Sequence, residues 1–212
     1  MYKRQADILP PLVPDAILPP TQVIDDFEKS YELVGTLKEL AQGPIILLPV
    51  FTRCKGACPA LAQGLRSATR ELTELMKDVK VVVYTFDPED VGKSLQEFRS
   101  AQQLPNEWLM IRSDSENSKR FFDALQYSYL DQDGDFIHPN QFFVFNKNLE
   151  WKGLVVGTDF KPSQLQDVLE LARGSMGIIE TSFKFPEPLA VIAGILFMAL
   201  TLALFFYKTL RA

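Results

Sequence analysis

The chain contains 212 residues with a formal net charge of −5, two cysteines and one histidine, and 47% of its residues are hydrophobic. The length suits one globular domain with additional segments, and this composition excludes a disordered chain. An acidic balance without a basic run argues against nucleic acid as a partner. The few cysteines and the single histidine exclude a disulfide-rich scaffold, a zinc site of three or four cysteines and any site with two histidines.

The apolar periodicity predicts alternating strands and helices. Residues 45–51 (IILLPVF) and 80–86 (KVVVYTF) are almost continuously apolar, as expected for strands buried on both faces. Apolar residues at steps of three and four over residues 61–76 predict an amphipathic helix. Residues 147–148 are expected to form a tight hairpin turn. The remaining predicted elements are helix 91–103, strand 108–113, helix 116–127, strands 141–146 and 149–157, and helix 162–173.

This order of elements predicts an α/β fold, with a thioredoxin-like domain over residues 23–180. Parallel strands joined by helices form a sheet with helices on both faces, and sites gather at the carboxyl ends of its strands. Cys54 and Cys58 directly follow the strand at 45–51 and therefore lie at such an end. The preceding Pro-rich residues 1–22 are expected to form an extended arm.

A second apolar region predicts a single membrane-spanning helix over residues 188–208. Residues 189–207 contain no charged side chain, and as a helix they cover about 28 Å, close to the ~30 Å hydrocarbon core of a bilayer. Because Lys208 and Arg211 follow, the positive-inside rule places the tail 209–212 in the cytoplasm. The domain then lies on the outer (periplasmic or equivalent) face of the membrane.

Residues 1–30 contain no continuous apolar stretch of the signal-peptide type, and prolines interrupt them. Two arrangements remain open. Either this chain lacks a leader and its domain lies outside the cytoplasm, or it is tail-anchored with its domain in the cytoplasm. The paired cysteines favour the first arrangement.

The turn that carries Cys54 and Cys58 offers redox or metal chemistry. A helix that begins near Cys58 directs its N-terminal amides toward the sulfurs, which lowers thiol pKa values and favours the thiolate that binds metals and attacks disulfides. The spacing allows a disulfide or a soft metal between the sulfurs. Two structural cysteines are the simpler alternative, but Arg53 and Lys55 make this turn polar.

His138 follows the turn-rich DQDGD at 131–135 and precedes the strand at 141–146. A single loop histidine is most often solvated, but this loop approaches the cysteines if strand 141–146 lies near strand 45–51. Two thiolates and one imidazole suit copper, because Cu(I) prefers soft sulfur and Cu(II) accepts nitrogen. We expect DQDGD to form a turn, since its glycine is misplaced for a calcium-binding EF-hand loop.

The chain also resembles a known family, Sco/SenC, whose members are thioredoxin-fold, membrane-tethered copper chaperones of cytochrome c oxidase assembly. The resemblance extends from about residue 20 to residue 174. Three segments carry it: FTRCKGACP at 51–59, YTFDPED at 84–90 and FIHPNQFFVFNKN at 136–148.

The resemblance implies that Cys54, Cys58 and His138 bind copper for delivery to the binuclear copper site of a cytochrome c oxidase subunit. Asp87 matches a position that the family places near the site, so the resemblance implies a supporting role. An aspartate at a strand end can equally cap the next helix.

The chain departs from the family in two respects. The segment Asp90-Val91-Gly92 replaces the Arg-Asp-Thr-Pro expected after Asp-Pro-Glu, and the anchor is C-terminal instead of N-terminal. The changed anchor suggests a lasting companion of a respiratory complex.

Three function classes remain open. The protein delivers copper by ligand exchange without turnover, or Cys54 and Cys58 act as a thiol–disulfide oxidoreductase on the cysteines of a partner. In the third class it is a structural accessory subunit of a respiratory complex with a vestigial site. Only the second class is enzymatic.

Overall fold

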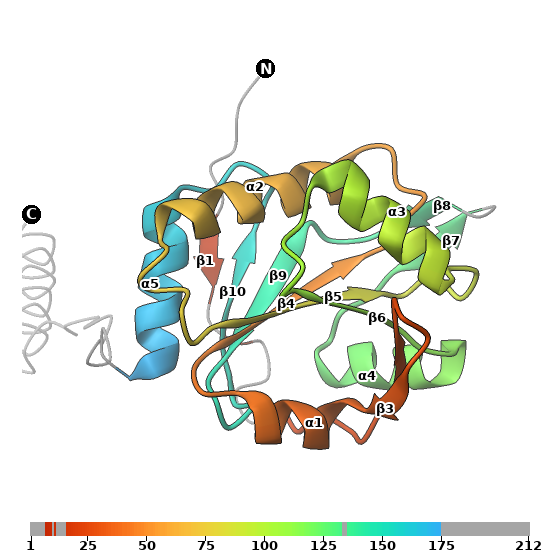
Figure 1. Ribbon diagram of the computed structural model, residues 1–212, viewed down its shortest axis with the longest axis horizontal. Helices are drawn as coiled ribbons and strands as arrows, with labels where there is room; N and C mark the ends of the chain where they lie inside the picture. The colour runs from red at the N-terminus through yellow and green to blue at the C-terminus, as the bar shows by residue number, and fades with distance from the viewer. Residues whose placement is uncertain (1–6, 10, 12–15, 133–134, 175–212) are drawn as a thin grey trace, which may run out of the picture. The chain divides into compact units, whose positions relative to one another are not determined.

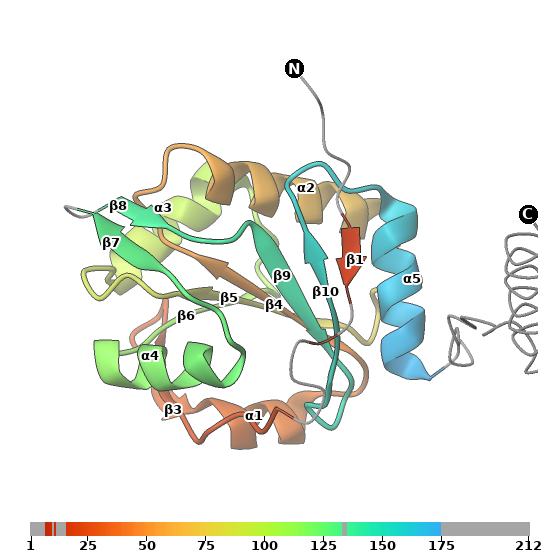
Figure 2. The same cartoon turned by 180° about the vertical axis from the view of Figure 1, so that it is seen from behind.

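The computed structural model describes residues 7–9, 11, 16–132 and 135–174. Within these residues the chain forms ten strands and five helices (Figures 1 and 2). Their bounds in chain order are β1 (Asp7–Leu9), β2 (Gln22–Asp25), β3 (Ser30–Glu32), α1 (Leu33–Leu40), β4 (Ile45–Val50), α2 (Ala57–Glu71), β5 (Lys80–Thr85), α3 (Gly92–Gln102), β6 (Leu109–Arg112), α4 (Ser115–Ala124), β7 (Leu130–Gln132), β8 (Asp135–Ile137), β9 (Gln141–Phe145), β10 (Trp151–Val156) and α5 (Pro162–Arg173).

Eight strands form one mixed sheet in the order β1-β10-β9-β4-β5-β6-β2-β3. Strands β4, β5 and β6 are parallel, whereas β9 is antiparallel to β4 and β10 is antiparallel to β9. Strands β7 and β8 pair antiparallel with each other in a separate two-stranded sheet. Because β9 runs against β4, the chain just before β9 lies at the carboxyl end of β4.

Helices cover both faces of the large sheet. Helices α2 and α3 lie on one face, and α1 and α4 lie on the other (Figures 1 and 2). Helix α5 contacts β9, β10 and α2. The predicted α/β architecture with helices on both faces is therefore confirmed.

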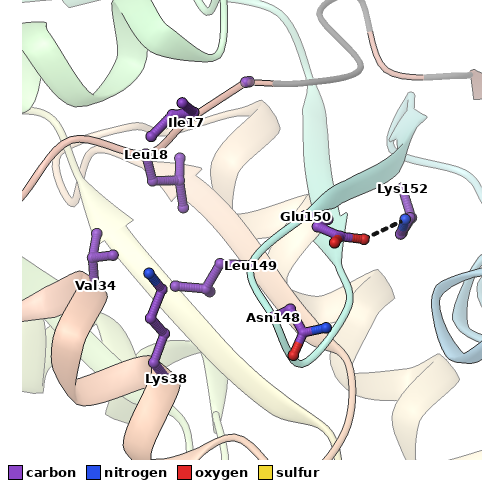
Figure 3. Close-up of a pocket in the computed structure, with 9 residues that line it drawn as sticks. Ile17, Leu18, Val34, Lys38, Asn148, Leu149, Glu150 and Lys152 are labelled. Atoms are coloured by element: carbon purple, nitrogen blue, oxygen red, sulfur yellow. Dashed lines mark hydrogen bonds and ion pairs between the residues drawn. The ribbon is translucent and has the colours of Figure 1, made fainter.

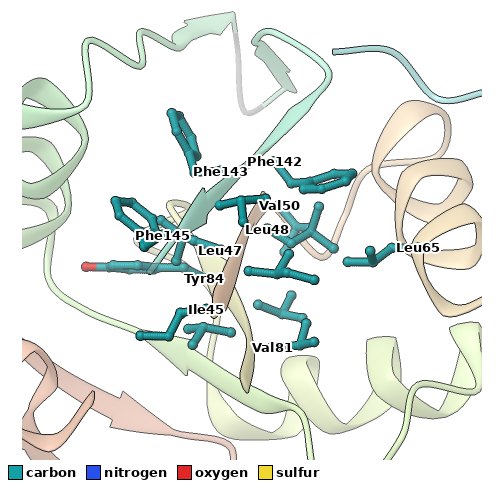
Figure 4. Close-up of a cluster of buried hydrophobic side chains, with 14 of the residues drawn as sticks. Ile45, Leu47, Leu48, Val50, Leu65, Val81, Tyr84, Phe142, Phe143 and Phe145 are labelled. Atoms are coloured by element: carbon teal, nitrogen blue, oxygen red, sulfur yellow. The ribbon is translucent and has the colours of Figure 1, made fainter. Parts of the chain in front are cut away.

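The core sits where the central strands meet these helices. Every residue of β4 and β9 is buried, and Figure 4 shows their side chains beside Leu65 of α2 and Tyr84 of β5. Each fully buried aliphatic or aromatic side chain contributes about 1.5–3 kcal/mol relative to an exposed one. The unbroken apolar runs in the sequence at 45–51 and 80–86 are explained by this burial of the strands on both faces of the sheet.

The elements predicted from residue 45 onward are all present, with ends shifted by up to five residues. The periodicity did not predict β2, β3 and α1, because elements of three to eight residues contain too few repeats of a pattern. The hairpin between β9 and β10 also has a longer turn than expected. Leu149 adopts a left-handed φ of 64°, adding a third residue to the predicted turn at 147–148.

A buried ion pair joins the end of β2 to α3. Arg99 of α3 donates through Nε and Nη2 to Oδ2 of Asp26, at 3.0 and 2.9 Å. The guanidinium also donates to the carbonyl oxygens of Pro105 and Trp108. Both charged side chains are almost wholly buried, so this polar cluster fixes the outer strands against α3.

The chain divides into two units, Met1–Gly177 and Ile178–Ala212, and only the first contains described residues. The predicted membrane-spanning segment 188–208 and the tail 209–212 lie outside the described residues. Among the helices of the described ranges, none combines the length and apolar character needed to cross a membrane. Of the predicted arm 1–22, residues 7–9 form β1, which pairs with β10.

Candidate metal centre

The two cysteines lie where β4 passes into α2. Cys54 is half-buried in the connecting loop, and Cys58 is buried in the first turn of the helix. Pro59 follows within this turn, where its missing N–H leaves no helical hydrogen bond unmade. The backbone N–H of Cys58 donates to Sγ of Cys54 at 3.4 Å, and both thiols are free.

His138 lies between β8 and β9 and reaches the same place. Its Nε2 is 3.3 Å from Sγ of Cys58. The predicted approach depended on the strand at 141–146 lying near that at 45–51, and β9 pairs directly with β4. The structure therefore brings His138 against Cys58, with Cys54 next to Cys58.

The other ring nitrogen of His138 faces a buried tyrosine. Nδ1 is 2.9 Å from Oη of Tyr127 and 3.0 Å from the carbonyl oxygen of Pro139. Sequence reasoning missed Tyr127, because it follows α4 without any local motif. Only the fold carries it to His138.

Aromatic rings surround the Cys58–His138 pair. The ring centroids of Phe51 and Phe86 lie 5.6 and 5.3 Å from that of His138, and both contacts are edge-to-face. Phe136 packs against Phe51 and Phe86 and completes an apolar wall. The inner side of the site is thus apolar.

This burial sets the protonation of the pair. Desolvation raises the pKa of the Cys58 thiol and lowers the pKa of His138. The expectation that the helix N-terminus lowers the thiol pKa is wrong for Cys58, where desolvation by burial is the largest influence and raises that pKa. Burial thus favours the uncharged form of both side chains.

An open cleft of about 470 Å³ gives access to the site. Cys54 and His138 line it, whereas Cys58 lies beneath its surface. The other lining residues are Phe51, Lys55, Gly56, Ala57, Asp135, Phe136, Ile137 and Asn140.

Asp87 supports the cysteine loop through Arg53. Its buried Oδ2 accepts from Nε and Nη2 of Arg53 at 2.8 and 2.7 Å. Its Oδ1 accepts from the backbone N–H of Glu89 at 2.9 Å. Helix α3 is capped at Val91, so Asp87 braces the residue before Cys54 and does not cap the next helix.

Asp90, in the segment that departs from the family pattern, is a second buried support. Its carboxylate accepts from the backbone N–H and hydroxyl of Thr52 and from the hydroxyls of Thr85 and Ser94. It thereby ties the start of the cysteine loop to the end of β5 and the first turn of α3. Sequence reasoning did not single out this role.

The candidate ligands lie close together, but they do not surround one common position. In the part of the chain that the structure describes, no three His, Cys, Asp or Glu side chains are already gathered to hold a metal ion. Cys54, Cys58 and His138 are therefore not arranged around a common point in this structure. Their donor set of two sulfurs and one imidazole nitrogen fits copper.

A separate cavity of about 420 Å³ lies between residues 16–18, α1 and the β9–β10 turn (Figure 3). Leu18, Val34 and Leu149 provide its apolar lining, and an ion pair between Glu150 and Lys152 lies at its margin. None of the candidate ligands lines it.

One cysteine in the loop after a central strand and one in the first turn of the next helix face a histidine from the loop before the neighbouring strand, and this arrangement defines a thioredoxin-like domain with a thiol–imidazole site. The sequence profile described as SCO1/SenC matches residues 25–173. The chain therefore belongs to the SCO1/SenC family, and the resemblance found in the sequence is confirmed. Among curated proteins no match is found.

Solved structures share the fold. A protein of Aquifex aeolicus described as a candidate electron transfer protein is 27% identical, with a TM-score of 0.69 over 76% of this chain and 95% of that chain. Copper-bound ScoI of Arabidopsis thaliana is 22% identical, with a TM-score of 0.62 over 74% and 99% of the two chains. Copper-bound yeast Sco1 is 16% identical, with a TM-score of 0.60 over 73% and 87%. The thioredoxin-like fold is therefore confirmed.

Proposed function

We propose that this protein binds copper through Cys54, Cys58 and His138 and delivers it to the binuclear copper site of a cytochrome c oxidase subunit. The 3.3 Å approach of His138 Nε2 to Cys58 Sγ carries the proposal. The copper held by the Arabidopsis and yeast relatives supports it. A further structural relative, BsSco, is described as belonging to the Sco family of cytochrome c oxidase assembly proteins.

The surroundings of the three donors suit a soft, exchangeable metal. Two sulfurs favour Cu(I), while the imidazole accepts Cu(II) as well. The rings of Phe51 and Phe86 pack against His138 and keep water from that side of the donors. Because the ligating thiols must lose their protons, copper uptake releases protons into solution.

Anaerobic loading of the reduced full-length protein with Cu(I) tests this function. We expect one retained copper per chain after desalting, measured by elemental analysis and by the ultraviolet absorption of copper–thiolate bonds. The Cys54→Ser variant is expected to lose most of this copper, because one of its two sulfur donors is gone.

Retention of no copper by the reduced wild-type protein would contradict the assignment and favour a structural subunit with a vestigial site. Equal retention by the Cys54→Ser variant would remove Cys54 from the ligand set. The copper–thiolate absorption of each protein comes from these two residues alone, because Cys54 and Cys58 are the only cysteines of the chain.

Thiol–disulfide exchange is a second candidate function, favoured by the exposure of Cys54 to the cleft and the N–H of Cys58 at its sulfur. The Cys54 thiolate attacks a partner disulfide and forms a mixed disulfide, releasing one partner thiolate. Cys58 then releases its proton to solvent, and its thiolate attacks Cys54 Sγ and releases the second partner thiolate. Two electrons pass to the partner, and the protein retains the disulfide.

We also propose that residues 188–208 anchor the protein in a membrane, with the domain on the outer face. The uncharged run 189–207 and the following Lys208 and Arg211 support this orientation. Protease added to cells with a permeabilised outer layer is expected to digest the domain and spare the tail. Digestion of the domain only after the inner membrane is opened would reverse the orientation.

A further inference from the structure

The hydrogen bonds on the Nδ1 side of His138 constrain where its proton lies. The carbonyl oxygen of Pro139 can only accept, so the 3.0 Å contact with His138 favours the tautomer in which Nδ1 carries the proton. The hydroxyl of Tyr127 donates to the same carbonyl at 3.3 Å. Its oxygen, 2.9 Å from Nδ1, is then left as a second acceptor for the Nδ1 proton.

This proton arrangement satisfies every group in the cluster. Nε2 of His138 is left with a free lone pair that points at Cys58 Sγ, 3.3 Å away. In this tautomer of the metal-free protein, the lone pair is placed to accept from the Cys58 thiol. The same lone pair is the one that a metal needs, because a neutral imidazole binds a metal through its unprotonated nitrogen.

We propose that Tyr127 is a positioning residue that fixes His138 in the Nδ1–H tautomer and turns Nε2 toward Cys58. Tyr127 is 2% exposed, and its ring packs against Phe86, Phe122 and Phe143, so its hydroxyl is held rigidly. Hydrogen bonds to the second nitrogen of a histidine ligand set its tautomer and orientation in metal sites. The tautomer assignment concerns the metal-free protein, whereas the effect on copper rests on the proposed function.

Nitrogen NMR of the single histidine tests this role directly. In the reduced, metal-free, full-length protein labelled with ¹⁵N-histidine, the two ring signals come from His138 alone. We expect Nδ1 to give a protonated-type signal and Nε2 an unprotonated-type signal. The reverse assignment would overturn the proposal without any variant.

The Tyr127→Phe variant removes one hydroxyl and keeps the ring. We expect it to populate both tautomers and to lower the affinity for Cu(I) about 10- to 100-fold, the usual effect of losing a partner behind a metal ligand. Tyr129→Phe is the matched control. Tyr129 belongs to the same ring cluster, and in the described part of the chain no hydrogen bond joins it to His138.

Unchanged tautomer signals in Tyr127→Phe would show that the Pro139 carbonyl alone holds the ring, and would overturn the role of Tyr127. Equal tautomer changes in both variants would also contradict it, because the effect would then come from the ring cluster. If the wild-type protein retains no copper, the proposed function fails, yet the tautomer signals still decide the role of Tyr127.

Discussion

Replacement of His138 by alanine is expected to lower the affinity for Cu(I) by more than about 100-fold, since loss of a partner behind a ligand already costs about 10- to 100-fold. Formation of the Cys54–Cys58 disulfide is expected to continue. Cys54 lies just before α2 and Cys58 in its first turn, and the support that Asp87 gives to this loop does not involve the imidazole.

Two measurements on one protein separate the two effects. Competition with a Cu(I) chelator under anaerobic conditions gives the affinity, and thiol titration after mild oxidation gives the disulfide yield. Asn140→Ala is the control, because Asn140 lines the cleft and is not a candidate ligand.

The outcome also distinguishes the two candidate functions. Copper delivery requires the imidazole, whereas thiol–disulfide exchange requires only the two cysteines. An affinity for Cu(I) that equals that of the wild-type protein would exclude His138 from the ligand set. A variant that loses both copper and disulfide formation would instead indicate a damaged fold.

Replacement of Asp26 by alanine is expected to lower the free energy of unfolding by about 3–5 kcal/mol, the usual cost of removing one partner from a buried ion pair. Arg99 would then carry an uncompensated charge in a site that is only 11% exposed. Its bonds to the carbonyls of Pro105 and Trp108 do not replace the lost carboxylate.

Thermal unfolding of the full-length chain in detergent measures this effect. At about 2–4 °C per kcal/mol for a domain of this size, the midpoint is expected to fall by at least about 6 °C. Asp123→Ala is the control. It breaks an exposed pair with Lys119 on α4, and such pairs contribute only about 0.3–0.5 kcal/mol.

A double variant sharpens this test. Asp26→Leu with Arg99→Met removes both charges and is expected to recover part of the stability lost in Asp26→Ala, because no buried charge is left alone. A midpoint for Asp26→Ala equal to that of Asp123→Ala would show that water or another group already compensates Arg99.

The predictable part of the fold is the part with long periodic segments. The six buried residues of β4 and the fifteen residues of α2 give unambiguous patterns. Strands β2 and β3 owe their place to pairing with β6 and with each other. Their three- and four-residue lengths contain no readable period.

The candidate site also has a part that could be predicted from the sequence and a part that could not. Cys54, Cys58 and His138 were predicted because few residue types can perform such chemistry, on the condition that β9, the strand that follows His138, lies beside β4, and the structure meets that condition. Tyr127 and Asp90 were not, because their roles depend on tertiary contacts between distant elements. The protonation of Cys58 was mispredicted for a related reason: the helix N-terminus is visible in sequence, whereas the aromatic burial is not.

Under the proposed function, the unequal exposure of the two sulfurs would give metal transfer a direction. Under the proposed function, an arriving ion meets Cys54 and His138 in the cleft before it reaches Cys58 beneath them. A receiving protein would approach from the same side, so its ligands would displace Cys54 first and Cys58 last. The buried sulfur would then keep the ion from solvent until the acceptor is attached.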